Sequence, residues 1–150
     1  MAQARETPRS PRGFLVDTNV LVSKKLCALR GLPGPLYVTP VVVLEYMNWA
    51  IASRNRMLAK RMHERAKGYE RLIGLLPSLL EALGVELIDQ GLDAEALREA
   101  ARLITERSVD PGDALNAVTA KRHGLGVVTG DRDWERLRDY AAQIIWLDEL

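Results

Sequence analysis

Short apolar runs alternate with longer amphipathic stretches along this chain, and each pattern predicts its own kind of element. The apolar runs predict buried strands at 14–17, 36–38, 85–88, 125–129 and 143–147. The amphipathic stretches predict helices at 21–30, 41–54, 54–76, 93–107, 111–123 and 134–140. Because strands that alternate with helices connect through right-handed crossovers, the pattern predicts an α/β fold with a parallel sheet in three layers.

Capping and breaking residues set several predicted boundaries. Thr39 is a good N-cap, and Pro40 is tolerated at the first helical position. Pro77 is expected to interrupt the long helix after residue 76, so that 78–83 forms only a further turn or two. The helix at 93–107 carries three apolar residues along one face: Leu97, Ala101 and Ile104.

The composition fits one folded domain. A chain of 150 residues with 47% hydrophobic and 27% charged residues can bury an ordinary core. We expect a flexible tail at 1–12 and a single domain at 13–150. No apolar run reaches the roughly 18 residues of a spanning helix, so we expect a cytoplasmic protein without a membrane partner. The net charge of +1 excludes nucleic-acid binding by bulk positive charge, and a single cysteine excludes an internal disulfide.

Two acids follow directly on predicted strands. Asp17 ends the first apolar run, and Asp131 follows the run at 125–129. In an open α/β sheet the ligand crevice lies beyond the carboxyl ends of the strands, so both acids are candidates for a site. The alternative for Asp17 is a helix N-cap, a position that aspartate favours. We favour the functional role.

Two further pairs of acids each contain one cap and one site candidate. The proline at 111 disfavours helical geometry at Asp110, which is therefore most simply the N-cap. Asp113 falls at the third helical position, where the helix dipole could explain it. The alanines that follow Asp113 indicate close packing on the sheet, which would aim it at the crevice. Asp133 is explained as the cap of the helix at 134–140, so Asp131 is the better site candidate.

Glu45 is the one charged residue between positions 31 and 53. A purely structural alternative is a partly exposed acid paired with an arginine. The residues around Glu45 in the sequence, however, are apolar and none is basic. An acid in such surroundings needs a partner or a function. Glu45 is therefore the fourth site candidate.

Four carboxylates that meet at one site repel one another. At about 5 Å and an effective dielectric near 20, each pair is unfavourable by roughly 3 kcal/mol. Something positive must hold them, and oxygen ligands without a cysteine or histidine cluster suit Mg²⁺ or Mn²⁺ rather than zinc. Such an ion binds phosphate oxygens and activates water, so phosphodiester hydrolysis is the predicted chemistry.

These residues resemble the motifs of the PIN domain family, and most of all those of VapC-type toxins from prokaryotic toxin–antitoxin pairs. The matching pieces are the segment 14–19, Glu45 in its apolar helix, the segment 113–117 and the segment 129–131. They occur in the family's order and span nearly the whole domain. Each piece alone is weak, and the combination is fairly specific.

The resemblance implies a PIN-like sheet of order 3-2-1-4-5 and a divalent-metal-dependent ribonuclease that forms a homodimer and binds a VapB-type antitoxin. It makes Asp17, Asp113 and Asp131 the ligands of Mg²⁺ or Mn²⁺. Glu45 is then a catalytic residue that positions metal or water. The resemblance also implies a supporting set of polar side chains: Thr18, Asn19, Asn116 and Thr129.

The basic stretch at 54–71 has two interpretations. A solvated helix face is the more common case. Alternatively, its arginines contact RNA phosphates while its Met and Leu stripe receives a partner helix from a second subunit or an antitoxin. Two alternatives to a toxin ribonuclease also stay open: a PIN-fold nuclease of RNA processing outside toxin–antitoxin systems, and a non-catalytic regulatory or adaptor domain.

Overall fold

The structure is a computed structural model that describes residues 10–150, so most of the expected tail at 1–12 lies outside the described residues. The five strands are β1 (Phe14–Val16), β2 (Leu36–Val38), β3 (Val85–Leu87), β4 (Gly126–Thr129) and β5 (Ile144–Trp146). The α-helices are α1 (Thr18–Leu21), α2 (Pro40–Ala59), α3 (His63–Leu83), α4 (Ala94–Arg107) and α5 (Pro111–His123). Three 3₁₀ helices complete the chain: η1 (Leu26–Gly31), η2 (Arg132–Tyr140) and η3 (Leu147–Glu149).

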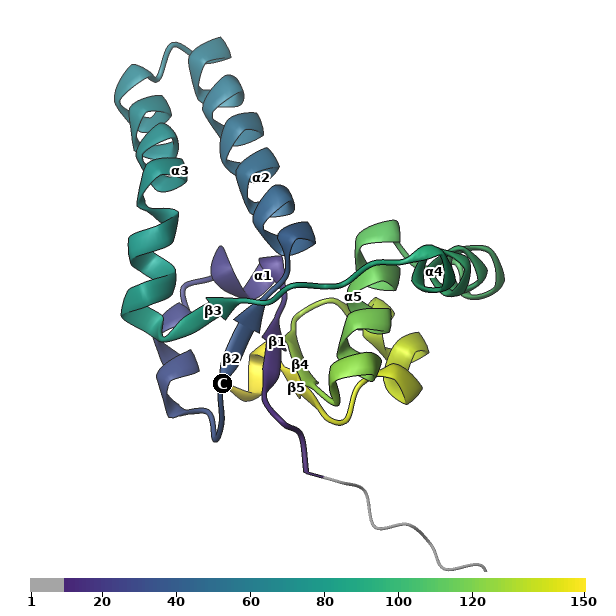
Figure 1. Ribbon diagram of the computed structural model, residues 1–150. Coiled ribbons are helices and arrows are strands. Elements are labelled where there is room, and N and C mark those ends of the chain that lie inside the picture. Colours follow the sequence, from purple (N-terminus) through teal and green to yellow (C-terminus); the bar gives the residue numbers. More distant parts are fainter. Residues whose placement is uncertain (1–9) are drawn as a thin grey trace, which may run out of the picture.

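The five strands form one sheet in the order β3-β2-β1-β4-β5, and every neighbouring pair is parallel. The predicted α/β class and the order 3-2-1-4-5 are therefore confirmed. The strand order reverses between β1 and β4, which lie side by side at the centre of the sheet (Figure 1). At such a switch point the crevice beyond the strand ends is open to a ligand.

The register between β1 and β4 depends on a glycine. Phe14 lies opposite Gly126, and a Cβ atom added to Gly126 would lie 2.7 Å from the ring of Phe14. Two residues further along, Val16 lies opposite Val128, and the N–H of Asp17 donates to the carbonyl of Val128 at 2.9 Å. This register brings the last residue of β4 beside Asp17.

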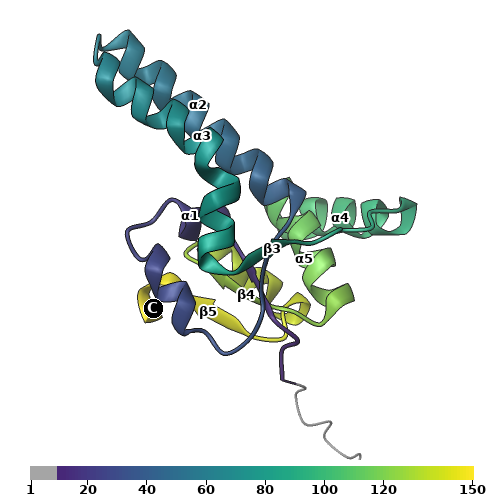
Figure 2. The same cartoon turned by 60° about the vertical axis from the view of Figure 1, so that its left-hand side comes forward.

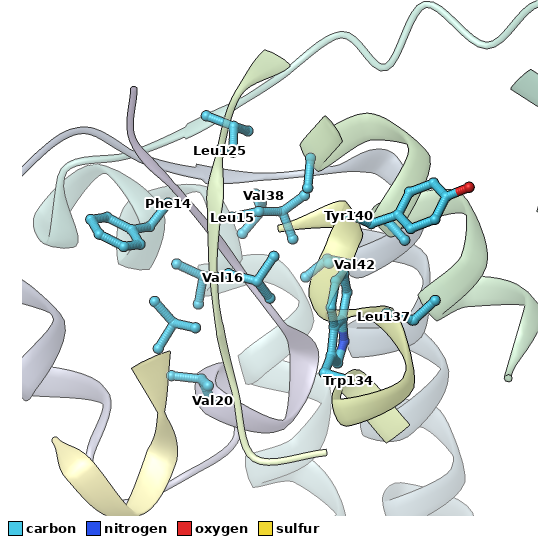
Figure 3. Packing of buried hydrophobic residues seen from close by; sticks show 14 of the residues in the cluster. Phe14, Leu15, Val16, Val20, Val38, Val42, Leu125, Trp134, Leu137 and Tyr140 are labelled. Atoms are coloured by element: carbon cyan, nitrogen blue, oxygen red, sulfur yellow. The ribbon is translucent and has the colours of Figure 1, made fainter. Parts of the chain in front are cut away.

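The core lies on both sides of β1 and extends under the C-terminal part of the chain. Figure 3 shows Leu15 and Val16 of β1 among buried side chains from β2, α2 and η2. Trp134 is the largest side chain that is fully buried. Because Trp134 follows shortly after β4, its burial holds the segment after that strand against the sheet.

Helices α2 and α3 form a long hairpin that projects away from the sheet (Figures 1 and 2). The predicted boundary at residue 54 is wrong: α2 continues to Ala59, and the chain reverses at 60–62, where Arg61 adopts a positive φ of 57°. The change from apolar to basic residues alters the surface of a helix but does not end it. Although α3 has 21 residues, no helix within residues 10–150 is both long and apolar enough to cross a membrane.

Pro77 does not interrupt α3, contrary to the prediction. A proline inside a helix removes one hydrogen bond and disfavours the preceding turn. The residues on both sides of it compensate, because Leu76 and Leu83 are buried and Leu72, Leu79 and Leu80 pack against the core. Burial of these side chains outweighs the local preference of the proline.

Two other predicted helices differ in detail. The helix predicted at 21–30 is replaced by α1, which begins directly after Asp17, and by η1. In α4 the buried residues are Ala96, Ala100 and Leu103, one position before the predicted face, and Leu97 is 54% exposed. Alanines let α4 approach its neighbour α5 closely, so the smaller side chains face inward.

Candidate metal centre

Acids from several elements line one cavity of about 480 Å³ at the carboxyl edge of the sheet. Asp17 follows β1, Glu45 lies in α2, Asp113 lies in the first turn of α5, and Asp131 follows β4. The structure thus brings all four predicted acids to one place. They are separated by up to 114 positions in sequence, so only the fold makes them neighbours.

Asp17 is buried and fully hydrogen-bonded. Its carboxylate accepts from the backbone N–H of Thr18 at 2.8 Å, from the amide nitrogen of Asn19 at 3.0 Å and from the hydroxyl of Thr129 at 2.7 Å. Burial raises the pKa of Asp17 above its ordinary value, and these three hydrogen bonds oppose the rise. Asp17 is therefore both the cap of α1 and a wall of the cavity.

Asp113 is buried without such support. Asp113 is only 5% exposed, and its Oδ2 atom has no hydrogen-bond partner within residues 10–150. Burial, followed by the charges of Asp17 and Asp131, raises the pKa of Asp113 to about 9. An unpartnered carboxylate oxygen in this position is unfavourable unless a cation or a proton occupies the site.

Glu45 reaches the same cavity from α2. Its Oε1 atom is buried and likewise finds no hydrogen-bond partner in the described part of the chain. Burial, then the charges of Asp17, Asp110 and Asp131, raise the pKa of Glu45 to about 7. A Cβ atom added to Gly112 would lie 2.9 Å from this oxygen, so the glycine leaves room for α2 and α5 to meet here.

Asp131 lines the cavity, and the cap of η2 lies at Asp131 rather than at Asp133, which corrects one predicted role. Asp131 is the residue that caps η2, because it accepts from the N–H of Asp133 at 2.9 Å. Asp133 is not a cap. It pairs with Arg136 and offers a carboxylate oxygen that lies within 4.8 Å of ligand atoms from Asp113 and Asp131.

The donor set of this cavity fits a hard divalent cation. Carboxylate oxygens of Asp113, Asp131 and Asp133 lie within 4.8 Å of one another, and the predicted ligand Asp17 is not part of this group. The buried Oδ2 of Asp113 and Oε1 of Glu45 have no hydrogen-bond partner among residues 10–150. Mg²⁺ and Mn²⁺ prefer oxygen ligands of this kind.

Three wall residues of the cavity were not among the predicted site residues: Val22, Trp49 and Asp110. Asp110 caps α5 as predicted, accepting from the N–H of Gly112 at 3.0 Å, and it also lines the cavity. Trp49 lies one helical turn after Glu45, and its ring packs against Tyr46 and Tyr69. The spacing of four residues from Glu45 is a signal that could have identified Trp49.

The predicted supporting residues divide into two groups. Asn19 binds Asp17 and also accepts from the N–H of Gly130 at 2.6 Å, so it ties the ends of β1 and β4 together. Thr18 lines the cavity, and Thr129 donates to Asp17. Asn116 lies deeper: its oxygen accepts from the hydroxyl of Thr39 at 2.7 Å rather than contacting an acid through any hydrogen bond seen in residues 10–150.

A family model described as PIN domain matches residues 14–140, which include every acid of the cavity. The chain belongs to the PIN domain family. Among curated proteins, no match is found. This PIN domain also shares its fold with chains of three solved structures, one of which is described as a member of the VapBC family of toxin–antitoxin systems.

The three structures are similar in fold and distant in sequence. A chain of VapBC2 from Rickettsia felis, bound to a DNA fragment from its promoter, has a TM-score of 0.57 at 17% identity, covering 87% of this chain and 96% of that one. A chain of VapBC-5 from Mycobacterium tuberculosis has a TM-score of 0.55 at 21% identity, covering 91% and 100%. A chain of FitAB bound to the IR36 DNA fragment has a TM-score of 0.53 at 20% identity, covering 88% and 93%.

Proposed function

We propose that this PIN domain is a divalent-metal-dependent ribonuclease, with Mg²⁺ or Mn²⁺ as its cofactor, and the toxin of a VapBC-type toxin–antitoxin pair. The observation that carries the proposal is the buried Asp113, whose oxygen lacks a protein partner within residues 10–150 while other acids surround it. A purely structural acid would have been paired or replaced by a neutral residue. Membership in the PIN family supports the nuclease assignment.

The residues around the cavity suggest separate tasks. Asp17, Asp113 and Asp131 would hold the ion, which when bound neutralises phosphate charge and activates water. Asn19 and Thr129 hold Asp17 in place through their hydrogen bonds. Asp133 is a candidate for an additional ligand.

Glu45 is suited to proton transfer. Its carboxylate reaches the cavity, where it would accept a proton from the attacking water. In the metal-free protein, burial and the nearby acids raise its pKa to about 7. Its position on α2, opposite the acids at the strand ends, leaves the cavity between them for the phosphate.

An antitoxin partner is proposed for the exposed side of α2. Leu44, the neighbour of Glu45 in sequence, is 60% exposed, and Met47 lies on the same side three residues later. Part of the apolar face of α3 is already covered within this chain, because Leu72 packs against the core and Trp49 packs edge-on against Tyr69. An antitoxin segment that covers Leu44 would also approach the cavity. We propose a homodimer as the second assembly, on the family resemblance alone.

The nuclease assignment can be tested with purified protein and single-stranded or structured RNA. We expect cleavage with added Mg²⁺ or Mn²⁺, none in EDTA, and none for Asp113→Asn. Glu86→Gln is the matched control, because Glu86 is an exposed acid on β3. The same ions should raise the melting temperature of the parent and not that of Asp113→Asn. Cleavage that persists in EDTA or in Asp113→Asn would contradict the proposal.

The toxin role needs a separate test. A small DNA-binding-type reading frame immediately upstream, whose product co-purifies with this chain and blocks cleavage, would support it. Light scattering of the purified chain would test the homodimer. Metal-dependent cleavage without growth arrest on expression would favour an RNA-processing role instead.

A further inference from the structure

A second cavity, of about 400 Å³, lies beside the acidic one and differs from it in charge and polarity. Its lining combines two cations, one acid, a glycine, an aromatic ring and an apolar side chain: Lys25, Gly130, Arg132, Trp146, Leu147 and Asp148. The wall between the cavities is thin. The N–H of Gly130 donates to Asn19, which lines the acidic cavity.

The segment after β4 contributes alternately to the two sites. Asp131 and Asp133 belong to the acidic group, whereas Gly130 and Arg132 line the second cavity. A Cβ atom added to Gly130 would lie 3.1 Å from Leu147 and 3.3 Å from Asn19. Gly130 is thus packed between a residue of each cavity, Leu147 of the second and Asn19 of the acidic one.

Arg132 and Lys25 supply positive charge at the mouth of this cavity. The guanidinium of Arg132 lies over the ring of Trp146 at 4.4 Å from its centroid, and Trp146 itself is only 7% exposed. The ammonium of Lys25 donates to the backbone carbonyl of Leu147 at 3.2 Å. This contact ties the loop after α1 to the C-terminal turn, and Figure 2 shows these segments close together.

The present partners of Arg132 are exchangeable. It forms ion pairs with Asp148 at 3.1 Å and with Glu135 at 3.7 Å, and all three side chains are more than half exposed. Exposed ion pairs contribute little to stability and can give way to a better anion. A phosphate group accepts two hydrogen bonds from a guanidinium and is such an anion.

We propose that this cavity binds the nucleotide of the RNA chain next to the scissile phosphate. The base lies against the apolar and aromatic lining, and its phosphate is held by Arg132 and Lys25. Stacking on aromatic and guanidinium planes together with phosphate contacts is how proteins bind single-stranded RNA. The assignment rests on the proposed function, because it takes RNA as the substrate.

The test is binding of a fluorescein-labelled single-stranded RNA oligonucleotide, measured by anisotropy in EDTA so that no cleavage occurs. Arg132→Ala and Lys25→Ala should each weaken binding roughly tenfold, the effect of losing one charge-assisted hydrogen bond. The slope of log affinity against log salt should fall by about 0.7 for each lost phosphate contact. With metal present, both variants should raise KM and leave kcat nearly unchanged.

Two further variants sharpen the result. Arg98→Ala is the matched control, since Arg98 forms the same kind of exposed pair with an acid three residues away, on α4. Its affinity should equal that of the parent. Asp148→Asn should tighten binding, because it frees Arg132 and removes a like charge from the mouth. A weaker or unchanged complex with Asp148→Asn counts against the assignment.

The proposal is overturned if Arg132→Ala and Lys25→Ala bind RNA as tightly as Arg98→Ala. Lys25→Ala keeps the test informative if Arg132→Ala fails to fold. The result is separable from that of the proposed function. Binding that depends on Arg132 without metal-dependent cleavage would support an RNA-binding cavity and refute the nuclease. Cleavage with unchanged binding and KM in both variants would support the nuclease and refute the cavity assignment.

Discussion

Helix α5 carries two kinds of buried polar residue on one face. Asp113, Asn116 and Thr119 follow one another at a spacing of three, and all are buried. At the far end, the hydroxyl of Thr119 accepts from Gln90 at 2.9 Å and donates to the carbonyl of Leu115 at 3.0 Å. At the near end, Asp113 has an oxygen without a partner among residues 10–150 and lies among other acids.

The difference separates a structural role from a functional one on the same helix. The neutral pair at Thr119 satisfies its donors and acceptors and therefore favours the fold. The acid at Asp113 opposes the fold of the metal-free protein, because burial and like charges disfavour its ionised form. Asn116 lies between them, with its oxygen bonded to Thr39. The change from a hydrogen-bonded neutral side chain at Thr119 to an acid at Asp113 marks the end of α5 that borders the cavity.

The largest expected effect comes from making Asp113 neutral. Asp113→Asn keeps the shape of the side chain and removes a metal-binding charge, so we expect nuclease activity to fall by about 10³-fold. Thr119→Val on the same face should keep its activity per folded molecule. Initial rates of RNA cleavage, corrected for the folded fraction, provide the measurement. Equal losses in the two variants would remove the distinction between the two ends.

The pH dependence of the metal-free protein tests the same difference. The folded-state pKa values of Glu45 and Asp113 are raised to about 7 and about 9, so the unfolded chain releases these protons first. The stability contributed by the protonated side chains is fully present below the pKa values of the unfolded chain. It is lost as pH rises through the pKa values of the folded chain. Between about pH 5 and about pH 9 we therefore expect the free energy of unfolding to fall by several kcal/mol.

Urea denaturation in EDTA at several pH values measures this loss. Asp113→Asn should reduce the pH dependence and stabilise the metal-free protein at high pH. Asp17→Asn is a less direct probe, because three hydrogen bonds support the carboxylate of Asp17. A flat profile for the parent would contradict the described electrostatics.

The hydrogen bond between Thr119 and Gln90 can be removed in a separate experiment. Thr119→Val leaves Gln90 buried without its hydrogen bond and should destabilise the protein by about 1–3 kcal/mol at any pH. Because both partners of a buried bond can be replaced with little loss, Gln90→Leu combined with Thr119→Val should recover part of the stability. Urea midpoints of the single and double variants decide this.

The smallest effect is expected at Asp133. Its charge is already paired with Arg136, and it lies at the edge of the acidic group. Asp133→Asn should lower activity by roughly tenfold, the size typical of a group that supports metal ligands. A loss as large as that of Asp113→Asn would make Asp133 a principal ligand and would change the description of the site.

The apolar runs predicted the strands well. The central strands β1 and β4 are buried along their whole length, whereas the edge strand β3 exposes Glu86 and Leu87. The sheet order came from the family resemblance, since no local pattern reports which strands are neighbours. Local reasoning failed where one residue has two roles or where packing overrides propensity. Asp110 is both a cap and a cavity wall, and α3 continues through Pro77 because flanking leucines are buried.

Three of the central acids were predictable because Asp17 and Asp131 follow strands and Glu45 interrupts an apolar stretch. Asp113 was predictable from the small residues that follow it in its helix. Asp133 was assigned as a cap because η2 was expected to begin near residue 134, and it begins at Arg132. Such a shift of two residues exchanges the roles of Asp131 and Asp133. The second cavity could not have been predicted, since Lys25 and Trp146 are 121 positions apart and meet only in the folded chain.

The packing of the Phe14 ring against Gly126 affects both the stability of the fold and the positions of the acids. Both residues lie at the end of their strands farthest from the acids, yet their fit sets how far β1 advances along β4. A single methyl group at position 126 would force this ring to move, or one strand to slide against the other. Sliding would carry Asp17 away from Thr129, so the site could be lost without any change in a residue that touches it.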